Sequence, residues 1–289
     1  MFIQGILDLF GSAMEVSYGF LTQDLSSFSP GAASVMEAVN GGLQAFSYAL
    51  LAVLTLWNVV HTATSYAELK KPEMLLKFFL RFALTKYAVG MAWPIVTGIV
   101  TVCGALTGSV FVSAGLTDGN AWAGITAPDF GGNSIMDIIA STVGALLNPL
   151  AKVPELLLGL LGFIVALVLS VTLMLTVIGR FFKIYLFAAL SPIPLSCFGA
   201  EDTRHIGRGF LHSFAAVSLE GLVIGLAMIV FAAYSQNPLI TFESWGIFNW
   251  LGAAAEEITY MFTLIFNMLL LLGLIKGADQ AVQQIFSHH

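Results

Sequence analysis

The chain has 289 residues, of which 58% are hydrophobic and 10% are charged, and its mean hydropathy is +0.90. A soluble domain has about 45–50% apolar and about 25% charged residues, so this composition excludes a soluble globular protein and predicts an all-α polytopic membrane protein. The 11 Lys and Arg against 17 Asp and Glu exclude a basic nucleic-acid-binding domain as the main role.

Residues 1–42 contain no Lys or Arg, so they lack the cationic start of a secretory signal. Their apolar residues recur at helical spacing, which predicts an amphipathic helix outside the membrane. This helix is expected to pack on the outer face of its own chain, and the alternative is a docking helix for a neighbouring subunit. The apolar positions are Ile3, Leu7, Phe10, Met14, Leu21, Leu25 and Phe28.

Five stretches are long and apolar enough to cross a membrane, because one crossing needs about 20 residues. They form the predicted membrane domain, residues 43–275, and comprise residues 43–63, 88–114, 156–178, 211–234 and 258–275.

A sixth apolar stretch, residues 184–198, is shorter and contains Pro192 and Pro194. Proline lacks a backbone donor and bends or ends a helix. We expect a broken, re-entrant segment here, which is tolerated only where protein or water covers its backbone.

The distribution of basic residues favours five crossings over six, because cytoplasmic loops collect Lys and Arg. Five crossings with an outer amino terminus leave only Lys152 outside, and residues 276–289 then form a short cytoplasmic tail. Six crossings would move Arg204, Arg208 and Lys276 to the outer side. The inner basic residues are Lys70, Lys71, Lys77, Arg81, Lys86, Arg180, Lys183, Arg204, Arg208 and Lys276.

Residues 68–86 predict an amphipathic helix at the inner face, with Lys70, Lys77 and Arg81 in one stripe beside apolar bulk. Such a stripe is typical of a helix on an anionic leaflet. The alternative is a docking face for an acidic partner or for passing nucleic acid. At the outer face, a capping-box pattern from Ser134 to Asp137 predicts a second interfacial helix.

Glu220 is the one acidic residue deep inside a predicted span. An ionisable group there faces a bundle interior or a water-filled cavity. Two interpretations are open for Glu220: a hydrogen-bonded packing residue and a functional carboxylate. The pairs Gly104/Gly108 and Gly221/Gly225 have the GxxxG spacing that permits close helix contacts within one chain or between chains.

The sequence contains no Walker A, HExxH or GxSxG motif and no Cys/His cluster, so it predicts no enzymatic site, no metal and no cofactor. Cys103 and Cys197 stand in apolar surroundings and are expected to be packed thiols.

One segment resembles a known family. The run Ala189-Leu190-Ser191-Pro192-Ile193-Pro194-Leu195 is followed by Phe198-Gly199, residues 201–204, Gly207, Phe210 and Ser213-Phe214-Ala215. This pattern is similar to the TrbL-type conjugal transfer proteins, and the likeness extends over residues 65–87 and, in hydropathy, from about 43 to 276. The chain departs from many relatives in lacking a long carboxy-terminal extension.

The resemblance implies a component of the inner-membrane channel of a type IV secretion system, which passes single-stranded DNA and protein. It also implies several copies, other secretion subunits and separate ATPases. A homo-oligomeric ring is expected, because one five-span bundle would be filled by its own side chains. Two alternatives stay open: a stand-alone secondary transporter, based on Glu220 and the Pro192 break, and a structural membrane scaffold.

Overall fold

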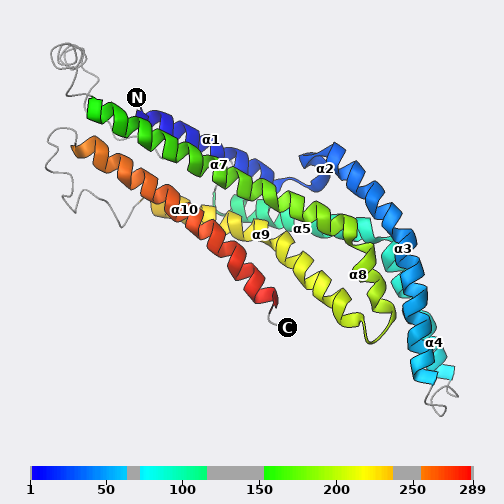
Figure 1. Ribbon diagram of the computed structural model, residues 1–289. Helices are drawn as coiled ribbons and strands as arrows, with labels where there is room; N and C mark the ends of the chain where they lie inside the picture. The colour runs from blue at the N-terminus through cyan, green and yellow to red at the C-terminus, as the bar shows by residue number, and fades with distance from the viewer. Residues whose placement is uncertain (1, 64–71, 116–152, 237–254, 288–289) are drawn as a thin grey trace. The chain divides into compact units, whose positions relative to one another are not determined.

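The computed structural model describes residues 2–63, 72–115, 153–236 and 255–287 (Figure 1). The described residues form helices joined by short turns and contain no strand, which confirms the all-α prediction. The helices are α1 (Phe2–Thr22), α2 (Leu25–Phe28), α3 (Pro30–Ala63), α4 (Pro72–Gly90), α5 (Ala92–Ser113), α7 (Val153–Leu190), α8 (Pro192–Ser196), the 3₁₀ turn η2 (Cys197–Gly199), α9 (Arg204–Gln236) and α10 (Ala255–Ser287).

Five helices in the described part of the chain are long and apolar enough to cross a membrane, which confirms a multi-pass membrane protein. Their outward faces are apolar; on α7, for example, Leu175, Phe182 and Leu186 are each about three-fifths exposed. Such faces require hydrocarbon around them. The five candidate spans are Pro30–His61, Ala92–Ser113, Gly159–Leu190, Arg204–Tyr234 and Thr259–Gly277.

The helices extend beyond the predicted spans at several ends. The predicted amphipathic helix of residues 1–42 is divided among α1, α2 and the start of α3, because Pro30 begins a new helix that continues into the first span. The third span was expected to end at residue 178. Instead, α7 continues to Leu190, because the residues after Lys183 remain apolar and helix-forming.

The helices belong to two compact units, which are described separately. The first contains residues 1–19, 109–177 and 224–278. Within it, the Phe10 ring meets Phe231 edge-on, with centroids 6.0 Å apart, and α7 and α10 approach closely at Gly162. A Cβ at Gly162 would overlap the Met261 thioether, so the glycine makes this contact possible.

The second unit contains residues 20–108, 178–223 and 279–289. Its core joins α2, α3, α5, α7 and α9, and Phe28 stacks on Phe181 with centroids 4.1 Å apart. Between helices in a membrane, such side chains stabilise the contact by close van der Waals packing, because lipid supplies no hydrophobic driving force of its own. The buried members are Leu25, Ala33, Val96, Val100, Phe181, Ile184, Tyr185, Ala188 and Phe214.

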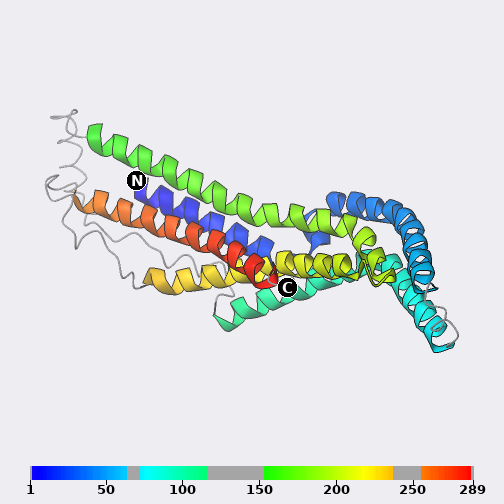
Figure 2. The ribbon, with the colours of Figure 1, turned by 60° about the horizontal axis from the view of Figure 1, so that its bottom comes forward.

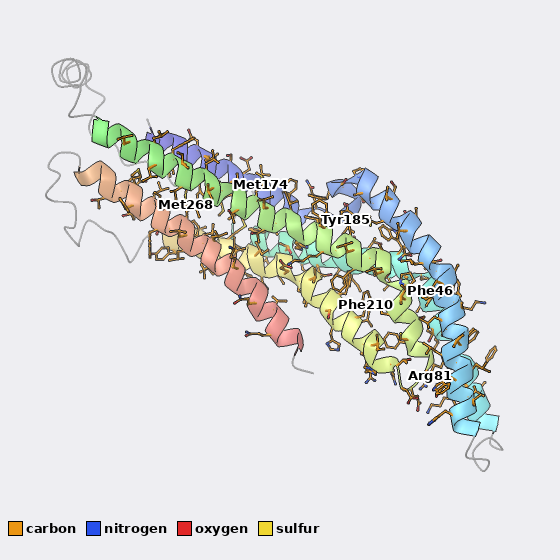
Figure 3. All side chains as sticks on the ribbon, viewed as in Figure 1. Phe46, Arg81, Met174, Tyr185, Phe210 and Met268 are labelled. Atoms are coloured by element: carbon orange, nitrogen blue, oxygen red, sulfur yellow. The ribbon has the colours of Figure 1, made fainter. Side chains whose placement is uncertain are left out.

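The short helix α2 is fixed at both ends by polar contacts. Asp24 caps its amino terminus, and the Asp24 carboxylate accepts a hydrogen bond from the Ser27 backbone N–H at 2.9 Å. This bonding, chiefly to Ser27, lowers the pKa of Asp24. The Tyr185 hydroxyl (Figure 3) donates to the Leu25 carbonyl oxygen at 2.6 Å in the first turn, and it lies 3.2 Å from the Ser29 carbonyl oxygen at the other end. These bonds attach α2 to α7.

A proline break separates α7 from α8. In an uninterrupted helix the N–H of residue 192 would bond the Ala188 carbonyl oxygen, but Pro192 has no N–H. Asn40 of α3 supplies a substitute: its Nδ2 donates to the Ala188 oxygen at 2.7 Å and to Ser191 Oγ at 3.1 Å. The Ser191 hydroxyl donates to the same carbonyl at 2.8 Å. Asn40 is fully buried, so the protein itself covers this break.

This arrangement refines the expected re-entrant segment, residues 184–198. Its first half is the end of α7, and only the part from Pro192 onward forms separate elements, α8 and η2. Both elements lie against α3 and α4, which run side by side (Figures 1 and 2). Gly199 lies so close to α3 that a Cβ there would overlap the Leu51 side chain.

The Asn40 contact generates a stability prediction. Replacing Asn40 by Leu removes the amide donor while nearly conserving volume, and it leaves the Ala188 carbonyl oxygen with fewer donors in a buried site. We expect a loss of about 1–3 kcal/mol, measured by thermal unfolding of the purified protein in detergent. Ser34→Ala, an exposed site on the same helix, is the control and should change little. Equal stability of both variants would show that the amide is dispensable.

A candidate charged site between the membrane helices

Three charged side chains meet between α7 and α9 in the second unit. Arg180 and Lys183 lie about one turn apart on α7, and Glu220 lies on α9. Arg180 is 1% exposed and Glu220 is 2% exposed. The Lys183 ammonium lies 3.4 Å from both carboxylate oxygens of Glu220 and forms an ion pair with it. Two cations therefore accompany one carboxylate.

The Arg180 guanidinium lies against the backbone of α9. Its Nη2 donates to the Ser218 carbonyl oxygen at 3.5 Å, a long hydrogen bond, while Nε and Nη1 have no hydrogen-bond partner. A Cβ at Gly221 would overlap the guanidinium, so only glycine leaves space for it. On its other side, the guanidinium carbon lies 5.4 Å from the Phe181 ring centroid, within the range of a cation–π interaction.

Glu220 lies in the middle of α9. Glu220 follows the start of α9 at Arg204 by 16 residues, which corresponds to roughly 24 Å along the helix axis. Phe182 and Leu186 next to the cations on α7 are exposed and apolar. Arg180 and Lys183, which we expected on the inner side after the third span, are helical residues of α7, and the candidate span on this helix continues to Leu190.

The predicted role of Glu220 changes accordingly. The sequence left Glu220 as either a hydrogen-bonded packing residue or a functional carboxylate, and the structure adds that Lys183 pairs with it and Arg180 lies nearby. Because Glu220 is buried and the Lys183 side chain is 45% exposed, the pair is only half buried, and removing Lys183 would leave the Glu220 charge without its ion-pair partner. The missed signal was the spacing of two cations three residues apart, followed by apolar residues up to Leu190.

The glycine pairs have different surroundings. Gly104 and Gly108 of α5 face the end of α1 within the same chain, where a Cβ at Gly104 would lie 3.7 Å from the Thr22 carbonyl oxygen. Gly221 accommodates Arg180, and Gly225 is buried on α9. Three of these four glycines thus meet atoms of their own chain.

The predicted basic stripe is divided by the fold. Lys77 is exposed, but Arg81 forms an ion pair with Glu201, with an Nη2–Oε1 distance of 2.7 Å, at the turn before α9 (Figure 3). The hydrogen bond from Arg81 is the main cause of a lowered pKa of Glu201. Arg81 therefore attaches α4 to this turn. Lys70, the outer capping box at Ser134 and the flanking loops lie outside the described residues.

Metal-binding groups and similarity to known proteins also bear on the interpretation of the site. Among the described residues, no group of three or more His, Cys, Asp or Glu side chains is arranged to hold a metal ion. The chain matches no family model, no curated protein and no solved structure in the comparisons. The candidate site must therefore be interpreted from its own chemistry.

A pair of glycine substitutions on α9 tests the Arg180 geometry. Gly221→Ala places a methyl group where the guanidinium lies, and we expect a loss of about 1–3 kcal/mol in unfolding free energy. Gly209→Ala is the matched control, because nothing lies within 4 Å of its Cβ position. This control should be neutral or stabilising by up to about 1 kcal/mol, since alanine favours helix. Thermal unfolding in detergent measures both, and equal effects would contradict the proposed packing.

Proposed function

We propose that this protein is a component of the inner-membrane translocation channel of a conjugative type IV secretion system. The observation that carries the proposal is the resemblance of residues 189–215 to TrbL-type proteins. This region contains the Pro192 break, and Asn40 stabilises that break by a buried hydrogen bond. A feature so firmly built into the fold is expected to matter to the protein's role.

Several further features agree with this role. The five candidate spans suit an integral membrane subunit. The helices of a single chain pack against one another and leave no room for DNA between them. A passage for DNA would therefore form between copies of the chain, so we propose a homo-oligomeric ring. Single-stranded DNA would pass transiently, and separate ATPases would supply energy, since the sequence has no nucleotide-binding motif.

We also propose an orientation in the inner membrane, with the amino terminus outside and the carboxy terminus in the cytoplasm. Arg180 and Lys183 no longer count as loop residues, because they lie inside α7. The remaining basic residues still favour five crossings, with eight inside and only Lys152 outside.

Cysteine-accessibility labelling tests this orientation. A cysteine at Ser26 should react with an impermeant reagent from outside, whereas cysteines at Arg204 and Ser287 should react only after the membrane is opened. The basis is the asymmetry of basic residues across the membrane. Labelling of the Arg204 position from outside would contradict five crossings.

The role of Glu220 is tested by DNA transfer between cells. Glu220→Gln retains the shape but removes the charge that pairs with Lys183, and we expect transfer to fall by at least tenfold at normal protein levels. Glu37→Gln, an exposed carboxylate on α3, is the control and should transfer normally. Normal transfer by a strain lacking this gene entirely would refute the proposed function.

A stand-alone secondary transporter is the second candidate. The buried charges of Arg180 and Glu220, the Lys183 cation paired with Glu220, and the Pro192 break favour it, because transporters use intramembrane charges and discontinuous helices. Substrate uptake by proteoliposomes containing only this protein would support the transporter. Dependence on secretion ATPases would support the channel.

A further inference from the structure

The outward face of α4 is apolar and is bordered by lysines. Placing residues at 100° intervals, the exposed apolar side chains occupy one broad arc, with Lys77 at one margin and Lys86 at the other. Both lysines are exposed, and long cationic side chains at such margins extend toward phosphate groups. The apolar arc comprises Leu76, Phe79, Leu80, Leu84 and Tyr87, of which Phe79 is 70% exposed.

The start of α9 adds cations to one margin of this arc. The pair between Arg81 and Glu201 brings α4 to the turn before α9. Lys77 lies one turn from Arg81, and the Arg204 backbone N–H bonds the Glu201 carbonyl oxygen at 3.3 Å. Both Lys77 and Arg204 also contribute to lowering the pKa of Glu201, which places their charges close to its carboxylate.

The charges on this surface do not cancel. Arg81 and Glu201 neutralise each other, which leaves three exposed cations, Lys77, Arg204 and Arg208, against two acids: Asp202, which is exposed, and Glu73, one turn before Lys77 on α4. Among the described residues, these three cations form no ion pair of their own. The surface therefore has a positive surplus next to apolar side chains.

We propose that this surface binds an anionic phospholipid. The phosphate group contacts Lys77 and Arg204, and an acyl chain lies along Leu76, Leu80 and Leu84. An apolar arc suits an acyl chain, whereas nucleic acid would require a continuous cationic track. This inference does not depend on the proposed role in conjugation.

Native mass spectrometry of the full chain in mild detergent tests the proposal. The protein is offered equal amounts of phosphatidylglycerol and phosphatidylcholine with identical acyl chains. We expect retention of phosphatidylglycerol in excess, by roughly fivefold for each contacting cation. Equal retention of the two lipids would overturn the proposal.

Matched variants locate the site. Lys77→Gln should reduce the excess, and Lys77→Gln/Arg204→Gln should abolish it, whereas Lys276→Gln, which removes an exposed lysine from α10, should preserve it. Lys77→Arg/Arg204→Lys retains both charges and should also preserve it, which separates charge loss from misfolding. An undiminished excess in Lys77→Gln/Arg204→Gln contradicts the site. Binding of a single-stranded oligonucleotide that requires Lys77 and Arg204, without lipid selectivity, would assign the surface to nucleic acid instead.

Discussion

The hydrogen bond from Asn40 to the Ala188 carbonyl oxygen is the contact on which the second unit depends. Pro192 deprives this carbonyl of its helical donor, and apolar surroundings offer no water in its place. Ser191 supplies a local donor, its hydroxyl, and Asn40 supplies a second donor from another helix, which ties α3 to the bend between α7 and α8. Because α4 runs back along α3, the same bond also brings α4 to the turn that carries Glu201. One buried amide thus positions three elements.

The same requirement explains the charges inside α7. A guanidinium surrounded by apolar side chains needs protein partners, and Arg180 obtains them from a backbone carbonyl of α9, the Phe181 ring and the charge of Glu220. Gly221 is the condition for this arrangement, because any side chain there would exclude the guanidinium. Glu220 in turn is compensated by Lys183. The α7–α9 contact thus compensates the Glu220 charge, whereas Arg180 donates one long hydrogen bond to α9 and keeps two nitrogens without a hydrogen-bond partner.

Hydropathy alone was sufficient to predict the number and approximate positions of the candidate spans, because apolar length is a local property of sequence. Hydropathy did not predict the features that depend on contacts between residues far apart in the sequence. The third span was ended before Arg180 because a cation usually marks the membrane boundary, and nothing nearby in sequence indicates that Glu220 lies opposite. Likewise, Arg81 has the spacing of a lipid-facing stripe, yet Glu201, 120 residues away, pairs with it. Asn40 gave no sequence signal at all, since its partner is 148 residues distant.

The two charged clusters of α9 differ in how much charge is exposed and available to bind other molecules. At Glu220 the carboxylate and the Arg180 guanidinium are buried, and the more exposed Lys183 is paired with Glu220, so these charges act on one another and on the packing of α7. At Arg204, roughly 24 Å earlier along the same helix, the cations are exposed and exceed the acids around them. Burial makes a charge part of the fold, whereas exposure with a surplus makes it available to a partner. The exposed cations at the start of α9 are therefore available to bind an anionic partner. The charges in the middle of α9 instead stabilise the contact between α7 and α9.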